Sequence, residues 1–441
     1  MDIEAALDYL QRHINLETDV GAVAAQMRLA RMAHMVELLG QPQRDYPVIH
    51  ITGTNGKGSV ARMITALLVG NGLAVGTYTS PHLDRVNERL AWNGEPIADE
   101  ALGEVLADVA LVEPHLASIP GNFGPPSYFE LLTAAAFRWF ADVAVDVAVV
   151  EVGLGGRRDA TNVADAAVAV VTNVSLDHTE VIGPTAAEIA REKAGIIKAG
   201  SILVLGETEE GLSEVFTSAA MQIGAPTILR RDQDFGLRDN RLALGGRVVD
   251  LFTPGCGYDQ VAISLHGGHQ GDNASAALAA AEAFLGTALP DDVVREAFGS
   301  IRMPGRLEVV GRSPLCVIDG AHNPAGAAAA SVAVAEAFAG VQGRVLVIGL
   351  LNGRHPGEML AALDAASARL VVTCAPPSPR AMPVAALSAA AAALGVPVEE
   401  ATSVAEALAT ALALAHKDEL VLVTGSLYIV GAARQALRGL S

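Results

Sequence analysis

The segment Gly53–Ser59 reads Gly-Thr-Asn-Gly-Lys-Gly-Ser, a pattern that could hold the phosphates of a nucleotide. Glycines allow backbone N–H groups to turn toward an anion, and the start of a helix adds partial positive charge. Lys57 would place its charge on the β- and γ-phosphates, and Ser59 would place its hydroxyl on Mg2+. The spacing departs from the strict P-loop pattern, because Ile51 replaces its first glycine and Gly58 separates Lys57 from Ser59. The alternative is an ordinary glycine-rich turn between a strand and a helix.

Possible metal ligands follow other apolar runs. Glu151 ends one such run, and His178 comes shortly after the run Ala167–Thr172. Side chains at the carboxyl ends of parallel strands face the crevice where α/β proteins bind ligands. With Ser59 and Ser80 these residues offer oxygen donors and one imidazole, a set that suits Mg2+ with several retained waters. Taken singly, a solvated glutamate and a structural histidine are the alternatives.

Lysine is rare in this chain. It occurs only at positions 57, 193, 198 and 417, among 30 lysines and arginines. A chain so biased toward arginine that still uses lysine indicates a chemical need for an amine. Lys193 lies in a helix that the capping box of Thr185 and Glu188 would open. The alternative is a solvated helix lysine paired with Glu188 or Glu192.

The elements around these residues predict an α/β fold. A strand at Tyr46–Thr52, the glycine loop, a helix over Val60–Val69 and a strand at Ala74–Thr79 form a unit typical of a parallel sheet. Further strands are expected at Val143–Val152, Ala167–Thr172 and Ile202–Leu205.

Other segments carry weaker patterns. The first forty or so residues read as amphipathic helix. Residues 225–262 predict short strands with turns at Gly236, at Asp239-Asn240 and at Gly245-Gly246. A helical stretch is expected after Asn273.

A second domain is expected after Met303-Pro304-Gly305, where the pattern breaks. We predict an N-terminal P-loop ATPase domain with a parallel central sheet over 1–302, and a smaller Rossmann-like α/β domain over 303–441. The strands and helix expected in the second domain are Leu315–Asp319, Ala325–Phe338, Arg344–Leu350, Leu370–Cys374 and Glu419–Thr424.

Composition excludes some classes of function. The formal charge of −19 over 441 residues argues against nucleic-acid binding, which needs dense lysine and arginine. Cys256, Cys316 and Cys374 have neither metal-ligand spacing nor a disulfide pattern, which fits a reducing compartment. The start lacks a signal-peptide pattern, and Ala385–Val398 is too short to span a bilayer. We expect a cytoplasmic protein, with no membrane partner and as a monomer.

The loop Gly53–Ser59 and a series of later motifs resemble the folylpolyglutamate synthase/dihydrofolate synthase family of the Mur ligase superfamily. The motifs cover nearly the whole chain and stand in the order that the family shows. They are Thr79–His82, Asn87–Arg89, Tyr128–Glu130, Glu151–Arg157, Asp159–Asn162, Asp177–Thr179, Glu192–Ile196, His269-Gln270 with Asn273, Pro304–Arg306, Asp319–Pro324 and Thr424–Ser426.

The resemblance implies a Mur-ligase-like fold and ATP-dependent ligation. L-glutamate would be joined to dihydropteroate, to (tetrahydro)folate polyglutamates, or to both, through an acyl phosphate. The cofactors would be ATP and two Mg2+ ions, one of them held by Ser80, Glu151 and His178 and the other touched by Ser59 through ATP. Lys193 would be carbamylated by CO2 and help to hold a metal ion, which arginine could not do because it has no free amine.

The resemblance also implies the remaining site residues. Lys57, Lys193 and His322 would be catalytic. The nucleotide contacts would be Gly53, Thr54, Asn55, Gly56, Lys57, Gly58, Ser59, Asn273, Arg306, Asp319 and His322. The acid substrate would contact Ser127, Tyr128, Phe129, Glu130, Arg158, Asp159 and Ala160, beside the loop Gly121–Pro126.

Two segments depart from the family pattern. Leu351–Pro356 replaces a short Asp-Lys-Asp element, and Gln26–Leu29 stands where an Asp-Leu-Gly-like signature is usual. One rival hypothesis is a different Mur-type ligase acting on a cell-wall or cyanophycin-like acid, which the segment Gly121–Glu130 disfavours. The other is a nucleotide-binding switch that ligates nothing.

Overall fold

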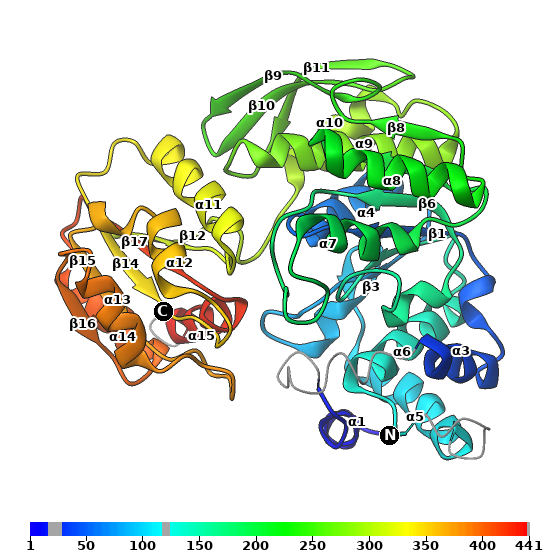
Figure 1. Ribbon diagram of the computed structural model, residues 1–441, viewed down its shortest axis with the longest axis horizontal. Coiled ribbons are helices and arrows are strands. Elements are labelled where there is room, and N and C mark those ends of the chain that lie inside the picture. Colours follow the sequence, from blue (N-terminus) through cyan, green and yellow to red (C-terminus); the bar gives the residue numbers. More distant parts are fainter. Residues whose placement is uncertain (16–28, 117–123, 439–441) are drawn as a thin grey trace. The chain divides into compact units, whose positions relative to one another are not determined.

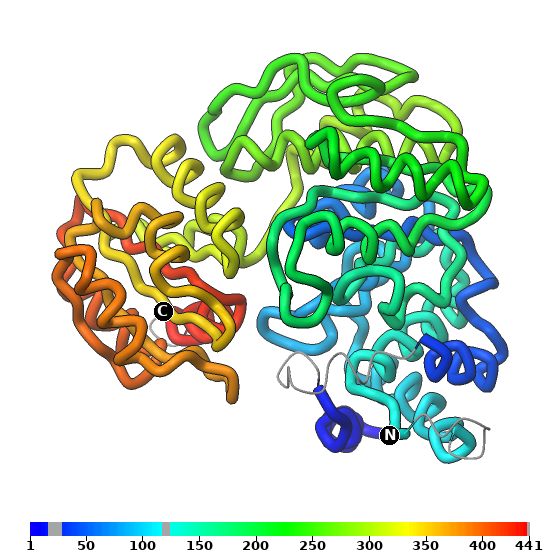
Figure 2. The backbone as a smooth tube through the Cα atoms, in the orientation of Figure 1, coloured from blue at the N-terminus to red at the C-terminus, as the bar shows by residue number. Residues whose placement is uncertain are grey.

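The computed structural model describes residues 1–15, 29–116 and 124–438, and they divide into two compact units. The first contains residues 1–240, 248–263 and 271–301, and the second contains 241–247, 264–270 and 302–441. Figure 1 labels the elements of both units, and Figure 2 traces their backbone. No helix in the described ranges has the length and hydrophobicity needed to cross a bilayer.

The first unit is built on an eight-stranded sheet in the order β4-β3-β2-β5-β1-β6-β7-β8. β2, β5, β1, β6, β7 and β8 are parallel, while β3 pairs antiparallel with β2 and β4 with β3. The strands are β1 (Val48–Thr52), β2 (Val75–Tyr78), β3 (Leu90–Trp92), β4 (Glu95–Pro96), β5 (Val147–Glu151), β6 (Ala166–Val171), β7 (Ile202–Leu205) and β8 (Ile228–Arg230). The parallel strands predicted from the sequence are therefore confirmed, although β5 begins at Val147 because the preceding helix ends at Asp142 and residues 143–146 form the turn between them.

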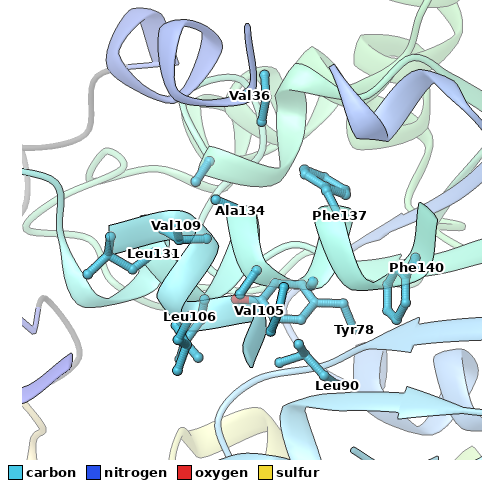
Figure 3. Packing of buried hydrophobic residues seen from close by; sticks show 14 of the residues in the cluster. Val36, Tyr78, Leu90, Val105, Leu106, Val109, Leu131, Ala134, Phe137 and Phe140 are labelled. Carbon is cyan, nitrogen blue, oxygen red and sulfur yellow. The ribbon is translucent and has the colours of Figure 1, made fainter. Parts of the chain in front are cut away.

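Helices complete the first unit. They are α1 (Ile3–Gln11), α3 (Leu29–Leu38), α4 (Lys57–Gly70), α5 (Asp99–Leu116), α6 (Tyr128–Asp142), α7 (Ala186–Lys193), α8 (Glu210–Ile223), α9 (His269–Leu285) and α10 (Asp291–Ser300). Figure 3 shows side chains of α3, α5 and α6 packed with Tyr78 of β2 in one apolar cluster. α4 contacts β1, β2 and β5. The segment Gly53–Ser59, called the phosphate loop below, leads into α4 and is therefore fixed to the centre of the sheet.

Two sequence predictions for these elements were wrong. The N-terminal region is not one helix, because α1 is capped at Arg12 and the chain leaves helical geometry before Asn15. Asp239-Asn240 lies inside strand β9 (Gly236–Ala243) rather than in a turn, since pairing with β10 (Gly246–Phe252) outweighs the low strand preference of these residues. The helix expected after Asn273 is confirmed as α9, which begins earlier, at His269, so that Asn273 lies within it. β11 (Gly257–Ile263) completes this three-stranded sheet.

The second unit has a six-stranded sheet in the order β12-β13-β17-β14-β15-β16, in which only β12 is antiparallel to its neighbour among the described strands. Its strands are β12 (Glu308–Arg312), β13 (Leu315–Ile318), β14 (Arg344–Ile348), β15 (Leu370–Thr373), β16 (Val398–Glu400) and β17 (Leu420–Thr424). Its helices are α11 (Pro324–Ala337), α12 (Pro356–Ala362), α13 (Val384–Ala392), α14 (Val404–Leu414) and α15 (Leu427–Arg438). The predicted alternation of strand and helix is confirmed.

Candidate nucleotide and metal site

The phosphate loop has the conformation that its glycines allow. Gly56 adopts a φ of +84° and caps α4, which begins at Lys57, so the free N–H groups of the first helical turn follow the loop. Gly53 has a φ of +152°, and a Cβ atom there would lie 1.8 Å from the Thr172 hydroxyl oxygen. No other residue type fits at position 53 unless the loop moves.

Thr172 and Asn173, which follow β6, hold the phosphate loop. The backbone N–H of Asn55 donates to Oδ1 of Asn173 at 3.0 Å, and Nδ2 of Asn173 donates back to the Asn55 carbonyl at 3.0 Å. The Thr172 hydroxyl donates to the same carbonyl at 2.6 Å. The sequence reasoning missed both roles, although the carboxyl end of a strand beside β1 is where such a partner is expected.

Two lysines meet at the Gly53 carbonyl. Nζ of Lys57 donates to it at 3.1 Å, and Nζ of Lys193 donates to it at 2.7 Å. Lys193 is 4% exposed, so the interpretation as a solvated helix lysine is wrong. Burial, followed by the charge of Lys57, lowers the pKa of Lys193 to about 7. A buried amine of this kind is partly unprotonated at neutral pH and can act as a nucleophile.

Glu151, the last residue of β5, lies beside the phosphate loop. Its side chain is buried, and its Oε2 accepts a hydrogen bond from the Ser80 backbone N–H at 3.1 Å. A Cβ atom on Gly58 would lie 3.4 Å from the same oxygen. The Glu151 carboxylate therefore bonds the segment that carries Ser80 and lies beside the start of α4.

His178 has a left-handed backbone with a φ of +50°, and its Nε2 lies 3.7 Å from Oδ1 of Asp177. Asp177 is buried and its charge acts on Lys193, which places this segment near the lysine. Over the described residues, no three His, Cys, Asp or Glu side chains gather as a metal cluster. Mg2+ does not require one, because it binds through one or two carboxylates, waters and substrate phosphates. Glu151 and the hydroxyl groups of Ser59 and Ser80 are donors of that kind.

The first part of the candidate acid site stands at the start of α6. The Ser127 hydroxyl accepts from the Glu130 N–H, and Glu130 accepts from the Ser127 N–H, so the two form a capping box. Glu130 also forms a buried ion pair with Arg31, in which Nη2 and Oε2 are 2.8 Å apart. The guanidinium of Arg89 lies 5.5 Å from the centre of the Tyr128 ring, and Phe129 fills the space beside Gly153. Glu130 thus has a structural partner, while Tyr128 lies against Arg89 and Phe129 against Gly153.

The second part is the turn at Arg158–Ala160. The Arg158 side chain is 41% exposed, and Oε1 of Glu192 accepts from its backbone N–H at 3.1 Å and from its Nε at 3.4 Å. Asp159 is 1% exposed and accepts from the Leu154 N–H at 2.8 Å, and Ala160 is buried. Only Arg158 can present a charged side chain to a ligand here. Residues 26–28 of the divergent N-terminal segment and residues 121–123 of the glycine- and proline-rich loop lie outside the described residues.

Asn273 lies in the first unit, against the phosphate loop. A Cβ atom on Gly56 would approach its Oδ1 to 2.5 Å. Arg306, Asp319 and His322 lie in the second unit. Asp319 follows β13 and accepts from the N–H groups of Leu307 at 3.0 Å and Ala321 at 2.9 Å.

His322 and Arg306 both lie close to Gly320. Nδ1 of His322 is 3.0 Å from the Gly320 carbonyl oxygen, and a Cβ atom on Gly320 would lie 3.3 Å from Nη1 of Arg306. The divergent segment Leu351–Pro356 turns at Gly353 and is held by a 2.7 Å hydrogen bond from the Asn352 N–H to the Arg380 carbonyl.

Known proteins resemble this chain over almost its whole length. Residues 128–281 match the Mur ligase middle domain, and residues 305–427 match the Mur ligase glutamate ligase domain. The dihydrofolate synthase/folylpolyglutamate synthase of Mycobacterium tuberculosis is 40% identical over 436 residues, which cover 92% of this chain and 89% of that protein. The chain belongs to the dihydrofolate synthase/folylpolyglutamate synthase family.

Solved structures of this family share the fold. The folylpolyglutamate synthase of Mycobacterium tuberculosis, complexed with ADP and AMPPCP, matches with a TM-score of 0.90 and 37% identity over 99% of both chains. E. coli FolC, complexed with DHPP and ADP, matches with a TM-score of 0.86 and 29% identity over 100% of this chain and 98% of that one. The family resemblance and the Mur-ligase-like α/β fold predicted from the sequence are confirmed.

Proposed function

We propose that this chain is an ATP-dependent ligase that joins L-glutamate to dihydropteroate, to reduced folate polyglutamates, or to both. The observation that carries the proposal is the convergence of Lys57, Lys193 and Glu151 on the phosphate loop of a chain that belongs to this family. The cofactors would be ATP and two Mg2+ ions. Ser59 would touch the ion that ATP brings, while Ser80, Glu151, His178 and carbamylated Lys193 would hold the other. Bound Mg2+ would neutralise charge on the transferred phosphoryl group.

The reaction would proceed in two steps. The carboxylate of the acid attacks the γ-phosphorus of ATP, and the bond from this phosphorus to the β-phosphate oxygen breaks. ADP is the leaving group, and the acid becomes an acyl phosphate. The amine of glutamate then attacks the acyl carbon, loses a proton, and inorganic phosphate leaves. Lys57 and the N–H groups at the start of α4 stabilise charge on the phosphates, and Arg158 helps to orient the acid. His322 is the candidate for stabilising the transferred group.

The assignment of regions belongs to the same proposal. Residues 1–302 would be the ATP-binding domain, and residues 303–441 would be the glutamate-ligase domain with Arg306, Asp319 and His322 as nucleotide contacts. Ser127–Glu130 and Arg158–Ala160 would form the pteroate side, with Asn273 toward the nucleotide. We propose a cytoplasmic monomer with small-molecule partners, which the odd set of unpaired cysteines and the net charge of −19 support.

Two parallel assays test this function. The chain is incubated with ATP, Mg2+ and L-glutamate, with dihydropteroate in one assay and tetrahydrofolate in the other, and the products are weighed by mass spectrometry. A glutamyl adduct in either assay supports the proposal and shows which activity is present. ADP release without an adduct in either assay would favour a ligase for another acid, and no ADP release would favour a switch.

A further inference from the structure

His50 is a buried polar residue in a strand that is otherwise apolar up to Thr52. It stands in the middle of β1 and is 0% exposed. Its Nε2 lies 2.8 Å from the hydroxyl oxygen of Thr161, which is also fully buried. Neither residue takes part in the steps described above.

The direction of this hydrogen bond follows from its neighbours. The Thr161 hydroxyl donates its single proton to Oδ1 of Asp159 at 2.5 Å, and the same carboxylate also accepts from the backbone N–H groups of Thr161 and Leu154. The hydroxyl oxygen must therefore accept from His50, so the proton of the neutral ring is on Nε2. Nδ1 is then an acceptor, and it is buried without a hydrogen-bond partner. An unpaired buried acceptor lowers the stability of the folded chain. An apolar residue at position 50 would not carry this cost.

The chain of hydrogen bonds ends on the turn that carries Arg158. Asp159 accepts from the Thr161 N–H at 3.0 Å with one oxygen and from the Leu154 N–H at 2.8 Å with the other. Two residues along β1, on the same face of the strand, the Thr52 hydroxyl donates to the Gly155 carbonyl at 2.7 Å. The strand that leads directly into the phosphate loop thus holds the turn Gly153–Arg158 at two points.

We propose that His50 is a positioning residue for the acid substrate. Through Thr161 and Asp159, it fixes the turn that presents Arg158 at a set distance from the phosphate loop. This matters in the proposed ligation, on which the inference rests, because the acid's carboxylate must lie in line with the γ-phosphate. Small displacements of a positioned group lower the rate steeply. The acid served in this way is a pterin-linked aminobenzoate, whose carboxylate a guanidinium can orient.

Four single variants of the full chain test the proposal, together with the double variant that combines His50→Leu with Thr161→Val. His50→Leu and Thr161→Val break the hydrogen-bond chain, whereas His50→Gln keeps an N–H donor near the position of Nε2. Thr65→Val is the matched control, since it removes another buried hydroxyl of the first unit, which bonds the Ala61 carbonyl at 2.9 Å and Thr77 at 2.6 Å. Each variant is measured for KM of the acid, for kcat and for the Kd of ADP.

The proposal predicts that His50→Leu and Thr161→Val raise the KM of the acid at least about tenfold and lower kcat, with the Kd of ADP within about twofold of the wild type. His50→Gln should recover most of this loss, Thr65→Val should resemble the wild type, and the double variant should be no worse than the worse single variant. If the wild-type protein is active as a ligase and His50→Leu has the same KM for the acid, the inference is wrong and the proposed function stands. A parallel loss of ADP affinity would also overturn it. A wild-type chain that ligates neither acid removes the function and the inference together.

Discussion

At the scale of single residues, the proposed chemistry centres on the buried amine of Lys193. The same carbonyl oxygen accepts from Lys193 and Lys57, so two positive charges would lie close together and repel each other. Loss of the proton, or conversion to a carbamate, removes that conflict. The pKa near 7 makes the free amine available at neutral pH, as carbamylation requires.

Lys193→Ala should therefore lower kcat by on the order of 100-fold, because the anionic group proposed beside the metal is lost. A small carboxylate such as acetate should restore part of the rate by entering the space left by the side chain. Lys417→Ala, at an exposed lysine, is the control and should keep the wild-type rate. Full activity of Lys193→Ala without added carboxylate would exclude the carbamate.

His50 gives a prediction on stability at acid pH. Burial, followed by the charge of Lys198, lowers the pKa of His50 to about 3 in the folded chain. In the unfolded chain the imidazole takes up a proton near pH 6.5. In the folded chain the same ring stays unprotonated until about pH 3. The contribution of His50 to the free energy of unfolding should therefore be fully present above pH 6.5. Below pH 6.5 it should fall by about 1.4 kcal/mol per pH unit.

Urea unfolding of the wild type and His50→Gln at pH 7 and pH 5 tests this sign. Lowering the pH should cost the wild type about 2 kcal/mol more unfolding free energy than it costs His50→Gln. Asp159 and Lys198 also titrate near this ring, but both remain in the variant, so they contribute alike to the two curves to first order. Equal losses in the two proteins would show that His50 is not held neutral by the fold.

At the scale of elements, the phosphate loop depends on contacts between strand ends. Gly53 lies against Thr172, so the loop after β1 and the end of β6 must fit together without a side chain between them. Gly72, at the end of α4, has a φ of +89°, but a Cβ atom there would meet nothing within 4 Å. The two glycines separate the effect of a clash from the effect of an unusual backbone.

Gly53→Ala should weaken ADP binding by more than about 100-fold, because the loop must move to admit the methyl group. Gly72→Ala has its own backbone strain, which should lower stability by about 1 kcal/mol and leave ADP affinity within about twofold. Titration calorimetry with ADP measures both. Similar ADP affinity in the two variants would contradict the assigned role of the loop.

A buried ion pair joins Arg31 of α3 to Glu130 of α6. Both side chains are buried, so Arg31→Met leaves a carboxylate without its partner and should lower the unfolding free energy by about 3 kcal/mol. Arg31→Met combined with Glu130→Met should regain part of that loss, since it removes the buried charge as well. Urea unfolding measures both, and a double variant less stable than Arg31→Met would contradict this account.

These elements also show what the sequence could predict. Strand ends and the glycine loop are local patterns, so the positions of Glu151, Asp319 and Lys57 followed from periodicity and spacing. The partners of Glu130, His50 and Asn55 lie about a hundred residues away in the chain, and no local pattern indicates such pairs. Asp239-Asn240 failed as a turn for the same reason, because strand pairing overrode local preference.

At the scale of the whole molecule, two mostly parallel sheets carry candidate site residues at the carboxyl ends of their strands. β1 and β5 lead to the phosphate loop and Glu151, and β13 leads to Asp319 in the second unit. This arrangement and the family membership together support one reaction, in which ATP activates a carboxylate that an amine then captures. The proposed acyl phosphate is the central claim.

Transfer of oxygen from the acid to phosphate tests that claim most directly. The acid that the chain uses is labelled with 18O in both carboxylate oxygens and incubated with the chain, ATP, Mg2+ and L-glutamate. The masses of the released phosphate and of the product are measured by mass spectrometry. Reaction through an acyl phosphate places one 18O atom in each phosphate and one in the new amide carbonyl. Phosphate without 18O, formed together with the glutamyl product, would contradict an acyl phosphate.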